Sequence, residues 1–316
     1  MKNLLKKIQN ASYAYDLWNN DSKIILGVSG GPDSACLLDI FCRLKEKYPL
    51  ELAIAHVNYG LRGADSEKDE EFVRELAEKY ALKIHILKPA VHSKINLEEK
   101  LREIRYDFFE KMRQENGFDL IAVAHNSDDQ TETFLMRVLR GSGLAGLGAM
   151  RHKNGKIIRP LLSISRQEIL EYLKERDLRH RTDKTNKTDL FLRNKIRNKL
   201  IPYLENNFNP NIRKTISDAT ISIAEDYSLI SETAEKFFMK NKDLSVKKLS
   251  RLHPSLLKQV LLRAAKRIDP DMKDIEAGFV EEMTKIVRST KNKPQIVVSK
   301  RLKLTRKGDK VTISKP

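Results

Sequence analysis

The sequence contains few cysteines: Cys36 and Cys42 are the two that occur among 316 residues. They lie six positions apart on one predicted helix and point to different faces, so we expect neither a disulfide nor a metal site from them. Such sparing use of cysteine indicates a reducing compartment. No apolar run reaches the roughly 18 residues that a membrane span needs, and the first residues lack a secretion signal. We therefore expect a soluble, cytoplasmic protein that does not enter membranes.

Acidic residues are scarce relative to basic ones. The chain has 60 Lys and Arg against 43 Asp and Glu, a net charge of +17. Such an excess attracts polyanions and favours a nucleic acid as partner. General solubility or unspecific attraction to ribosomes is the alternative explanation. A length of 316 residues with 40% hydrophobic content allows a sizeable core and favours two domains over one.

Short hydrophobic runs alternate with amphipathic stretches in the first part of the chain. The runs lie at residues 24–28, 52–57, 83–87 and 120–124. Helical periodicity follows most of them, and this order is typical of βαβ units. We therefore predict an α/β fold with a doubly wound parallel sheet. Ligands of such sheets bind beyond the carboxyl ends of the strands, so the segments that follow the strands should meet at one edge.

The first of these segments, residues 29–34, reads Ser-Gly-Gly-Pro-Asp-Ser. Gly30 and Gly31 let the backbone turn sharply and approach a ligand, and the helix that follows directs its positive end to the same place. An anion is the expected ligand. A carboxylate such as Asp33 would repel phosphate unless a divalent cation lies between them, so the loop suggests Mg²⁺ with a polyphosphate. The alternative is an ordinary helix start that Asp33 or Ser34 caps.

A second concentration of polar residues follows the fourth predicted strand. Asp128, Asp129 and Glu132 are spaced so that their carboxylates can share one face of the first helical turns. Clustered carboxylates can bind a cation, hold an amine or accept its proton. Acidic residues are also favourable at any helix N-terminus, which is the alternative explanation. His125, taken alone, is typical of a hydrogen-bonded histidine at a strand end.

These motifs resemble two related families. Residues 29–34 resemble the SGGxDS signature of the N-type ATP pyrophosphatases, the PP-loop family, whose fold is Rossmann-like. The segment from Ala124 to Met150 resembles the second signature of the tRNA(Ile)-lysidine synthetases, as do residues 56–62, although Tyr59 replaces the usual histidine. Four further segments also fit the pattern of this family: residues 98–106, in which Leu101 replaces the usual alanine, 159–162, 183–186 and 193–202. The resemblance covers roughly residues 20–205, and we expect the shorter form of the family.

The resemblance implies an ATP-dependent ligase that acts on the wobble cytidine in the CAU anticodon of tRNA(Ile). The enzyme would adenylate the base at C2 and attach L-lysine through its ε-amine, releasing AMP and pyrophosphate. The product, lysidine, changes codon reading from AUG to AUA. The implied cofactors are ATP and Mg²⁺, and the implied partners are L-lysine and the tRNA. A homodimer is compatible with the sequence, which does not determine the oligomeric state.

The resemblance also assigns roles to residues. Arg105 and Arg197 would stabilise charge on the α-phosphate and the base oxygen, and Asp129 and Glu132 would orient lysine and take its proton. Asp33 and Asp129 are the candidates for Mg²⁺ contact. The implied nucleotide contacts are Ser29, Gly30, Gly31, Pro32, Asp33, Ser34, His56, His125 and Gly141. Residues 141–148 read as a mobile loop or close-packing bend, and the resemblance implies that they close over ATP and the base. For the basic run at residues 193–199, a solvated helix face is the alternative.

Residues 206–210 interrupt the helical pattern and separate two predicted domains, 1–208 for catalysis and 209–316 for tRNA binding. The second domain should be mainly helical α+β. We predict a long helix at 212–239, two shorter helices at 254–266 and 274–288, and strands at 295–298, 302–304 and 311–313. The last strands are rich in Lys and Arg and could contact RNA phosphates, although a soluble sheet edge would have the same composition.

Three other functions share part of this pattern. A PP-loop tRNA sulfurtransferase would need reactive cysteines near the base, and Cys36 and Cys42 are badly placed. A PP-loop ligase that amidates a small molecule would not need a charge of +17. A non-catalytic RNA-binding protein regulated by ATP is a third alternative. Incorporation of lysine into tRNA that depends on ATP would distinguish all three from the predicted ligase.

Overall fold

The computed structural model describes residues 2–90, 96–181, 192–270, 272, 275–291 and 293–316. The chain divides into two compact units, Met1–Ser222 and Ile223–Pro316. The division falls inside helix α10 (Ile212–Lys240), and the boundary predicted at residue 208 lies just before this helix. The motif at 183–186 lies outside the described residues, as does the predicted helix start at Asp274.

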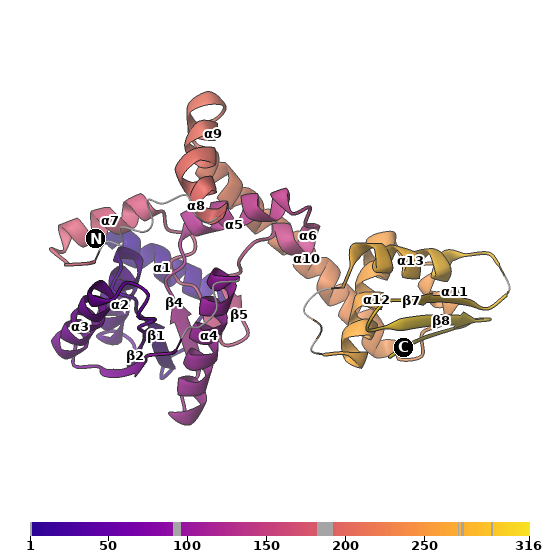
Figure 1. The fold of residues 1–316 in the computed structure, drawn as a ribbon, viewed down its shortest axis with the longest axis horizontal. Coiled ribbons are helices and arrows are strands. Elements are labelled where there is room, and N and C mark those ends of the chain that lie inside the picture. Colours follow the sequence, from indigo (N-terminus) through magenta and orange to yellow (C-terminus); the bar gives the residue numbers. More distant parts are fainter. Residues whose placement is uncertain (1, 91–95, 182–191, 271, 273–274, 292) are drawn as a thin grey trace. The chain divides into compact units, whose positions relative to one another are not determined.

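The N-terminal unit is built on a mostly parallel sheet with the strand order β3-β2-β1-β4-β6-β5 (Figure 1). The strands are β1 (Lys23–Gly27), β2 (Glu51–Val57), β3 (Lys83–Leu87), β4 (Leu120–Val123), β5 (Lys153–Asn154) and β6 (Ile157–Ile158). All neighbours pair in parallel except β5 and β6. β1 has β2 on one side and β4 on the other, so the strand order reverses there. The crevice beyond β1 and β4 is where such sheets bind ligands.

Helices cover both faces of this sheet, which confirms the predicted doubly wound α/β architecture. They are α1 (Lys2–Tyr15), α2 (Pro32–Lys45), α3 (Ala64–Lys79), α4 (Leu97–Glu115) and α7 (Arg166–Glu175). Successive residues of β1 alternate between two cores, because strand side chains point to opposite faces. Ile24 and Leu26 pack with α1, α2, α3 and α7, whereas Ile25 packs with Phe108 and Phe109 of α4. Residues 29–34, the loop that resembles the PP-loop signature and is called the PP-loop below, therefore follow a strand buried on both sides.

A buried carboxylate fixes the position of α2. Asp39 is 1% exposed and accepts hydrogen bonds from Tyr80 at 2.8 Å, from Tyr172, and from Arg176 at 3.3 Å. Burial alone would raise the pKa of Asp39, but the hydrogen bonds from Tyr172, Tyr80 and Arg176 lower it below its usual value. Asp39 thus ties α2 to the region of α3 and to α7, and so holds the helix that follows the loop at residues 29–34.

Replacement of Asp39 by alanine is expected to destabilise the N-terminal unit by about 3–5 kcal/mol, because the buried hydrogen-bond donors lose their common acceptor. Tyr80→Phe removes one donor and should cost about 1 kcal/mol. Urea unfolding measures both. Since the folded pKa is lowered, the contribution of Asp39 is present above the usual pKa of 3.8 and is lost as the pH falls through the folded value. Equal losses in the two variants would contradict the anchoring role.

Five further helical segments follow β4 in the described part of the N-terminal unit. They are α5 (Ser127–Leu139), α6 (Leu144–Leu147), α8 (Leu192–Lys195), the π-helix η2 (Ile196–Leu200) and α9 (Ile201–Asn207). The π-helix precedes Pro202, which has no N–H to donate to the preceding turn. Residues 141–148 contain a helical turn, α6, and Arg137 of α5 holds it by donating to the carbonyl groups of Gly146 and Ala149.

The C-terminal unit is mainly helical with a small antiparallel sheet, as predicted. Its elements beyond α10 are α11 (Val246–Leu249), α12 (Pro254–Ile268), α13 (Ala277–Arg288), β7 (Gln295–Val298), β8 (Lys303–Lys307) and β9 (Lys310–Ser314). The strands pair in the order β7-β8-β9. One core joins the helices to the sheet through residues such as Leu257, Met283 and Leu304. Of the helices that the structure describes, none has the length and apolar character to span a bilayer.

Candidate active site

The PP-loop connects β1 to α2 and is held closed by Ser34. The Ser34 hydroxyl accepts from the backbone N–H of Ser29 at 3.1 Å, donates to the Gly31 carbonyl at 3.0 Å and lies 3.2 Å from the Ser29 hydroxyl. Gly30 has a φ of +85°, which side chains rarely adopt. Pro32 occupies the start of α2, where a missing N–H costs nothing. The loop therefore presents backbone groups and the helix N-terminus to one space.

The two glycines of this loop should respond differently to a methyl group. Gly30→Ala forces a left-handed conformation and is expected to cost about 1–2 kcal/mol of stability. Gly31 has an ordinary φ of −71°, and an added Cβ would meet Ser29 Oγ at 3.6 Å, so Gly31→Ala should fold normally. Because Gly31 lines the cavity, that variant should instead raise the KM for ATP. Thermal melting and ATP kinetics check the contrast, and equal melting temperatures would contradict it.

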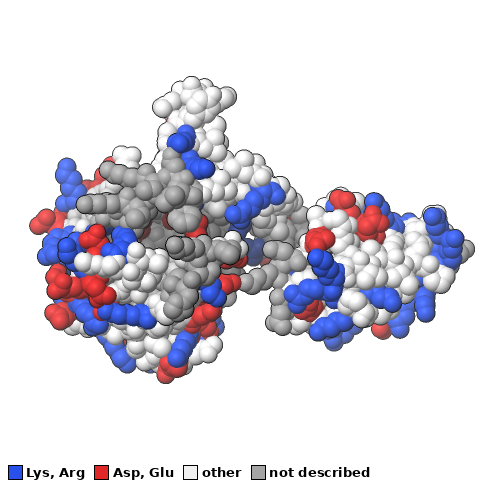
Figure 2. Space-filling view, in the orientation of Figure 1, with Lys and Arg blue, Asp and Glu red and all other residues white. Residues whose placement is uncertain are grey.

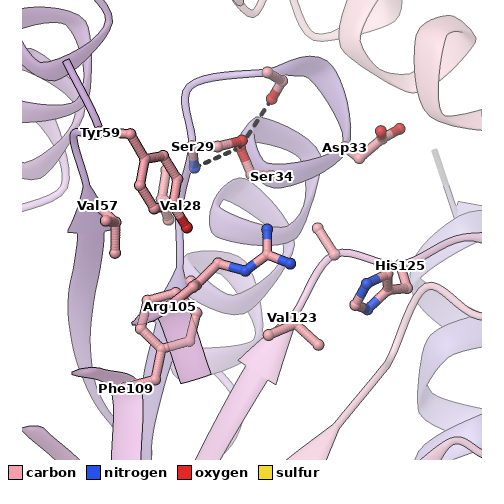
Figure 3. A pocket seen from close by; sticks show the side chains of 13 residues that line it. Val28, Ser29, Asp33, Ser34, Val57, Tyr59, Arg105, Phe109, Val123 and His125 are labelled. Carbon is pink, nitrogen blue, oxygen red and sulfur yellow. Dashed lines mark hydrogen bonds between the residues drawn. The ribbon is translucent and has the colours of Figure 1, made fainter. Parts of the chain in front are cut away.

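A cavity of about 190 Å³ lies at the mouth of the PP-loop. It brings together five of the residues predicted to bind nucleotide and the predicted catalytic Arg105. Figure 3 shows Arg105 reaching from α4 into the space between the PP-loop and His125. The predicted residues along its wall are Ser29, Gly31, Asp33, Ser34, Arg105 and His125. The carboxyl ends of β1, β2 and β4 thus meet at one edge, as predicted.

Four predicted nucleotide contacts do not line this cavity: Gly30, Pro32, His56 and Gly141. His56 is 4% exposed and its Nδ1 lies 2.8 Å from the carbonyl oxygen of Val28, so it supports the loop from behind. Burial lowers the pKa of His56. Gly141 lies exposed after α5 with a φ of +71°.

Sequence reasoning missed Tyr59 and Phe109 as cavity residues. Tyr59 donates from its hydroxyl to the Leu101 carbonyl at 2.7 Å and so closes the wall against α4. Phe109 packs over Gly27, where an added Cβ would lie 2.8 Å from the ring. Tyr59 could have been predicted as a cavity residue, because it follows β2 at the edge of the sheet where ligands bind. The helical periodicity of α4 marks Phe109 only as a core residue.

A direct hydrogen bond joins the PP-loop to the acidic helix α5. Asn126 Nδ2 donates to Asp33 Oδ1 at 3.1 Å. Asn126 also forms a reciprocal cap with Asp129, with bonds of 3.0 and 3.1 Å. The two motifs that the sequence singled out therefore share one site. Asn126 is 2% exposed, and sequence reasoning had assigned it no role.

Asp33 and Asp129 are the two carboxylates of this site that could contact a magnesium ion together with phosphate. Burial raises the pKa of Asp33, and the Arg166 guanidinium, 3.0 Å from its Oδ2, opposes that shift. Asp129 is close enough to raise it further. The described residues contain no cluster of three or more His, Cys, Asp or Glu side chains that would hold a metal by themselves. Mg²⁺ commonly uses one or two carboxylates together with nucleotide phosphates, and this pair fits that pattern.

The three acidic residues of α5 have different partners. Glu132 is fully buried and accepts from Arg193 Nε at 2.7 Å and Arg197 Nη2 at 2.9 Å. Asp129 Oδ1 accepts from Arg193 Nη2 at 2.9 Å, and its side chain is 15% exposed. Asp128 instead binds Arg213 at 2.7 Å and the backbone N–H of Arg166 at 2.9 Å. Asp128 therefore holds helices together, whereas Asp129 and Glu132 position two arginines.

The arginine predicted from the basic run, Arg197, lies in this group together with Arg193, for which no catalytic role had been predicted. Both approach from η2 and α8, the helices that follow residues outside the described part of the chain. Burial would lower the pKa of each guanidinium, but Asp129 and Glu132 raise it on balance. Both arginines therefore stay charged, Arg193 near His125 and Arg197 near Asp33 of the cavity wall.

Comparison with known proteins agrees with this geometry. Residues 1–204 match the PP-loop domain family. The chain is 37% identical to a tRNA(Ile)-lysidine synthase of Clostridium tetani over 90% of this chain and 64% of that protein. It is 31% identical to the one of Clostridioides difficile over 98% and 70%, and 33% identical to that of Geobacter sulfurreducens over 99% and 69%. The chain thus spans about two thirds of the length of these relatives.

Among solved structures, the U34-tRNA thiolase NcsA of Methanococcus maripaludis is similar in fold. Its TM-score is 0.61 with 23% identical residues, over 71% of this chain and 78% of that one. This likeness supports the PP-loop architecture and says nothing further of the chemistry.

Proposed function

Since the chain belongs to the tRNA(Ile)-lysidine synthase family of PP-loop proteins, we propose that it attaches L-lysine to the wobble cytidine of tRNA(Ile) with a CAU anticodon, using ATP. One observation carries the proposal. Asn126 bridges Asp33 of the PP-loop to the head of α5 at 3.1 Å. A nucleotide held by the loop would therefore lie beside the carboxylates that could orient an amine.

The first step is adenylation of the base. The C2 carbonyl of cytidine is a poor electrophile, and its oxygen is a poor leaving group. That oxygen attacks the α-phosphorus of ATP, a phosphorus–oxygen bond forms, and pyrophosphate leaves. Arg105, which points into the cavity (Figure 3), is placed to stabilise charge on the α-phosphate. Asp33 and Asp129 would hold Mg²⁺, which neutralises phosphate charge when bound.

The second step joins lysine to the base. The ε-amine is protonated in water and must lose a proton before its lone pair attacks C2. The C2–oxygen bond then breaks, and AMP leaves with the oxygen. Asp129 and Glu132 remain our candidates for orienting the amine and accepting the proton. Of the two, Asp129 is the more accessible, at 15% exposure of its side chain against 0% for Glu132. We infer that Asp129 faces the amine directly, whereas Glu132 supplies the negative charge that neutralises Arg193 and Arg197 beside it.

The thiol chemistry of a sulfurtransferase finds little support in the described residues. Both cysteines lie on α2 within the body of the domain, Cys36 buried and Cys42 half-buried. Burial raises the pKa of Cys36, and it raises that of Cys42 to about 12, so neither forms a thiolate at neutral pH. The acidic side chains of α5 are therefore better explained as a site that binds the amine of lysine than as part of a sulfur-transfer site.

We also propose that residues 209–316 bind the tRNA outside the anticodon and that the enzyme acts in the cytoplasm. Figure 2 shows Lys and Arg side chains on the visible face of the C-terminal unit. Exposed basic residues of β8 and β9 include Lys307 and Lys310, and such side chains suit contacts to RNA phosphates.

The proposal predicts that radiolabelled lysine enters a tRNA(Ile) transcript only when ATP is present. A transcript with uridine at the wobble position is the matched control and should gain no label, because uridine lacks the 4-amino group and the unprotonated N3 that make the C2 oxygen of cytidine nucleophilic. Pyrophosphate release without lysine incorporation would contradict the proposal and favour another PP-loop reaction.

A further inference from the structure

Arg159 is a buried arginine that has no carboxylate partner among the described residues. It follows β6 directly, is 5% exposed and donates from Nη1 to the Arg151 carbonyl at 3.0 Å. Its Nε is buried and has no hydrogen-bond partner among the described residues. A guanidinium removed from water costs several kcal/mol unless an anion pairs with it. Arg159 therefore has the environment of a ligand-binding residue rather than of a structural one.

The neighbours of Arg159 are also cations. Burial and the charges of Arg159, Arg105 and Arg102 hold the pKa of His125 well below its usual value. Arg102, whose side chain is exposed, stacks on the Tyr106 ring at 4.7 Å. Like Arg159 Nε, the Tyr106 hydroxyl and His125 Nδ1 are buried without a partner among described residues. This concentration of unpaired donors indicates a site for an anion.

The position of this site relative to α5 limits what the anion can be. Arg193 bonds to Asp129 and Glu132. It also lies close enough to Arg102 and His125 to lower the pKa of both, and Glu98 of α4 lies within its electrostatic reach as well. Zwitterionic lysine carries charges of matching sign, an ammonium group and a carboxylate, roughly 7 Å apart when extended.

Other anions fit less well. The ATP cavity is lined by Arg105, whereas Arg102 and Arg159 are not part of its wall. A phosphodiester within an RNA chain carries a ribose on each side and would have difficulty reaching a side chain that is 5% exposed. A free amino acid carboxylate is small and can accept two hydrogen bonds from one guanidinium.

We propose that Arg159, assisted by Arg102, binds the α-carboxylate of the lysine substrate while its ε-amine faces Asp129. This inference rests on the proposed function and adds how the amino acid is selected. A chain with this site distinguishes lysine from diamines and lysine derivatives whose carboxylate is absent or masked. Arg159 would thus determine substrate specificity without touching the reacting atoms.

The test compares lysine with lysinamide in wild-type protein and in Arg159→Gln, using the full chain, ATP and the CAU transcript. Wild type should use lysine with a kcat/KM about 10–100-fold higher than that for lysinamide. In Arg159→Gln, the kcat/KM for lysine should fall by about the same 10–100-fold, through a higher KM for lysine. The kcat/KM for lysinamide and the KM for ATP should stay unchanged. Arg159→Lys should restore part of the preference. Arg179→Gln, whose side chain is 79% exposed, is the matched control.

A second measurement does not depend on turnover or on a variant that folds. Equilibrium dialysis of wild-type protein with a non-hydrolysable ATP analogue should show tighter binding of lysine than of lysinamide. Equal binding of the two overturns the inference, as does an Arg159→Gln variant that keeps the preference. A variant whose KM for tRNA rises instead would place an RNA phosphate at Arg159 and also overturns it. Absence of any lysine transfer by wild type would count against the proposed function, and dialysis would still decide the inference.

Discussion

Asp33→Asn is expected to reduce adenylation of the CAU transcript about 10²–10³-fold, the size of effect seen when one preorganised group that stabilises transition-state charge is removed. Asparagine keeps the shape of Asp33 and one oxygen for the hydrogen bond from Asn126. It loses the negative charge that would hold Mg²⁺ against the phosphates. The variant should therefore fold normally but adenylate the transcript slowly.

Pyrophosphate release measured over a range of Mg²⁺ concentrations checks this result. The half-saturating Mg²⁺ concentration should rise in Asp33→Asn, and excess Mg²⁺ should restore part of the rate. Asp128→Asn is the control, because Asp128 binds Arg213 and the backbone of Arg166 instead of facing the loop. It should lower the melting temperature and leave the Mg²⁺ dependence unchanged. A normal Mg²⁺ dependence in Asp33→Asn would remove Asp33 from the metal site.

Glu132→Gln is expected to reduce lysine transfer about 10²–10³-fold and to affect adenylation much less. Glutamine preserves the volume of this fully buried side chain and retains one acceptor for Arg193 or Arg197. The charge beside the amine site is lost, so the arginines are no longer neutralised where a protonated amine must bind. Single-turnover measurement separates the two steps, because pyrophosphate reports adenylation and labelled tRNA reports transfer.

Glu132→Ala is the informative companion, because it removes both acceptor atoms and releases both arginines. It should impair adenylation as well as transfer, since Arg197 then loses its position. If Glu132→Gln lowers adenylation as strongly as transfer, Glu132 acts only by holding the arginines. An unchanged transfer rate in Glu132→Gln would remove Glu132 from the site altogether.

Much of the fold could be predicted because its signals are local. The four predicted hydrophobic runs are strands β1 to β4, and the amphipathic stretches after the first three are helices α2, α3 and α4. The convergence of loops on one edge follows from parallel strand order alone. The π-helix at 196–200 was not predicted, since it depends on how Pro202 interrupts a helix that otherwise looks regular.

The partners within the site depend on contacts that no local pattern encodes. Arg193 lies 61 residues from Glu132 and 64 from Asp129. The sequence marked Asp129 and Glu132 as a pair, but it could not show that one is accessible and the other buried by two guanidiniums. Arg159 matched the motif of the family, yet its burial without a carboxylate appears only in three dimensions. The structure therefore shows what the motifs do not: which charged side chains from different helices neutralise one another.

The nucleotide held by the PP-loop should activate the same base carbon that the amine at α5 attacks. A tRNA transcript whose wobble cytidine carries ¹⁸O at C2 tests it directly, with the products analysed by mass spectrometry after one turnover. Adenylation of that oxygen predicts that ¹⁸O appears in the released AMP and disappears from the tRNA. Unlabelled AMP formed together with lysine-modified tRNA would contradict the account.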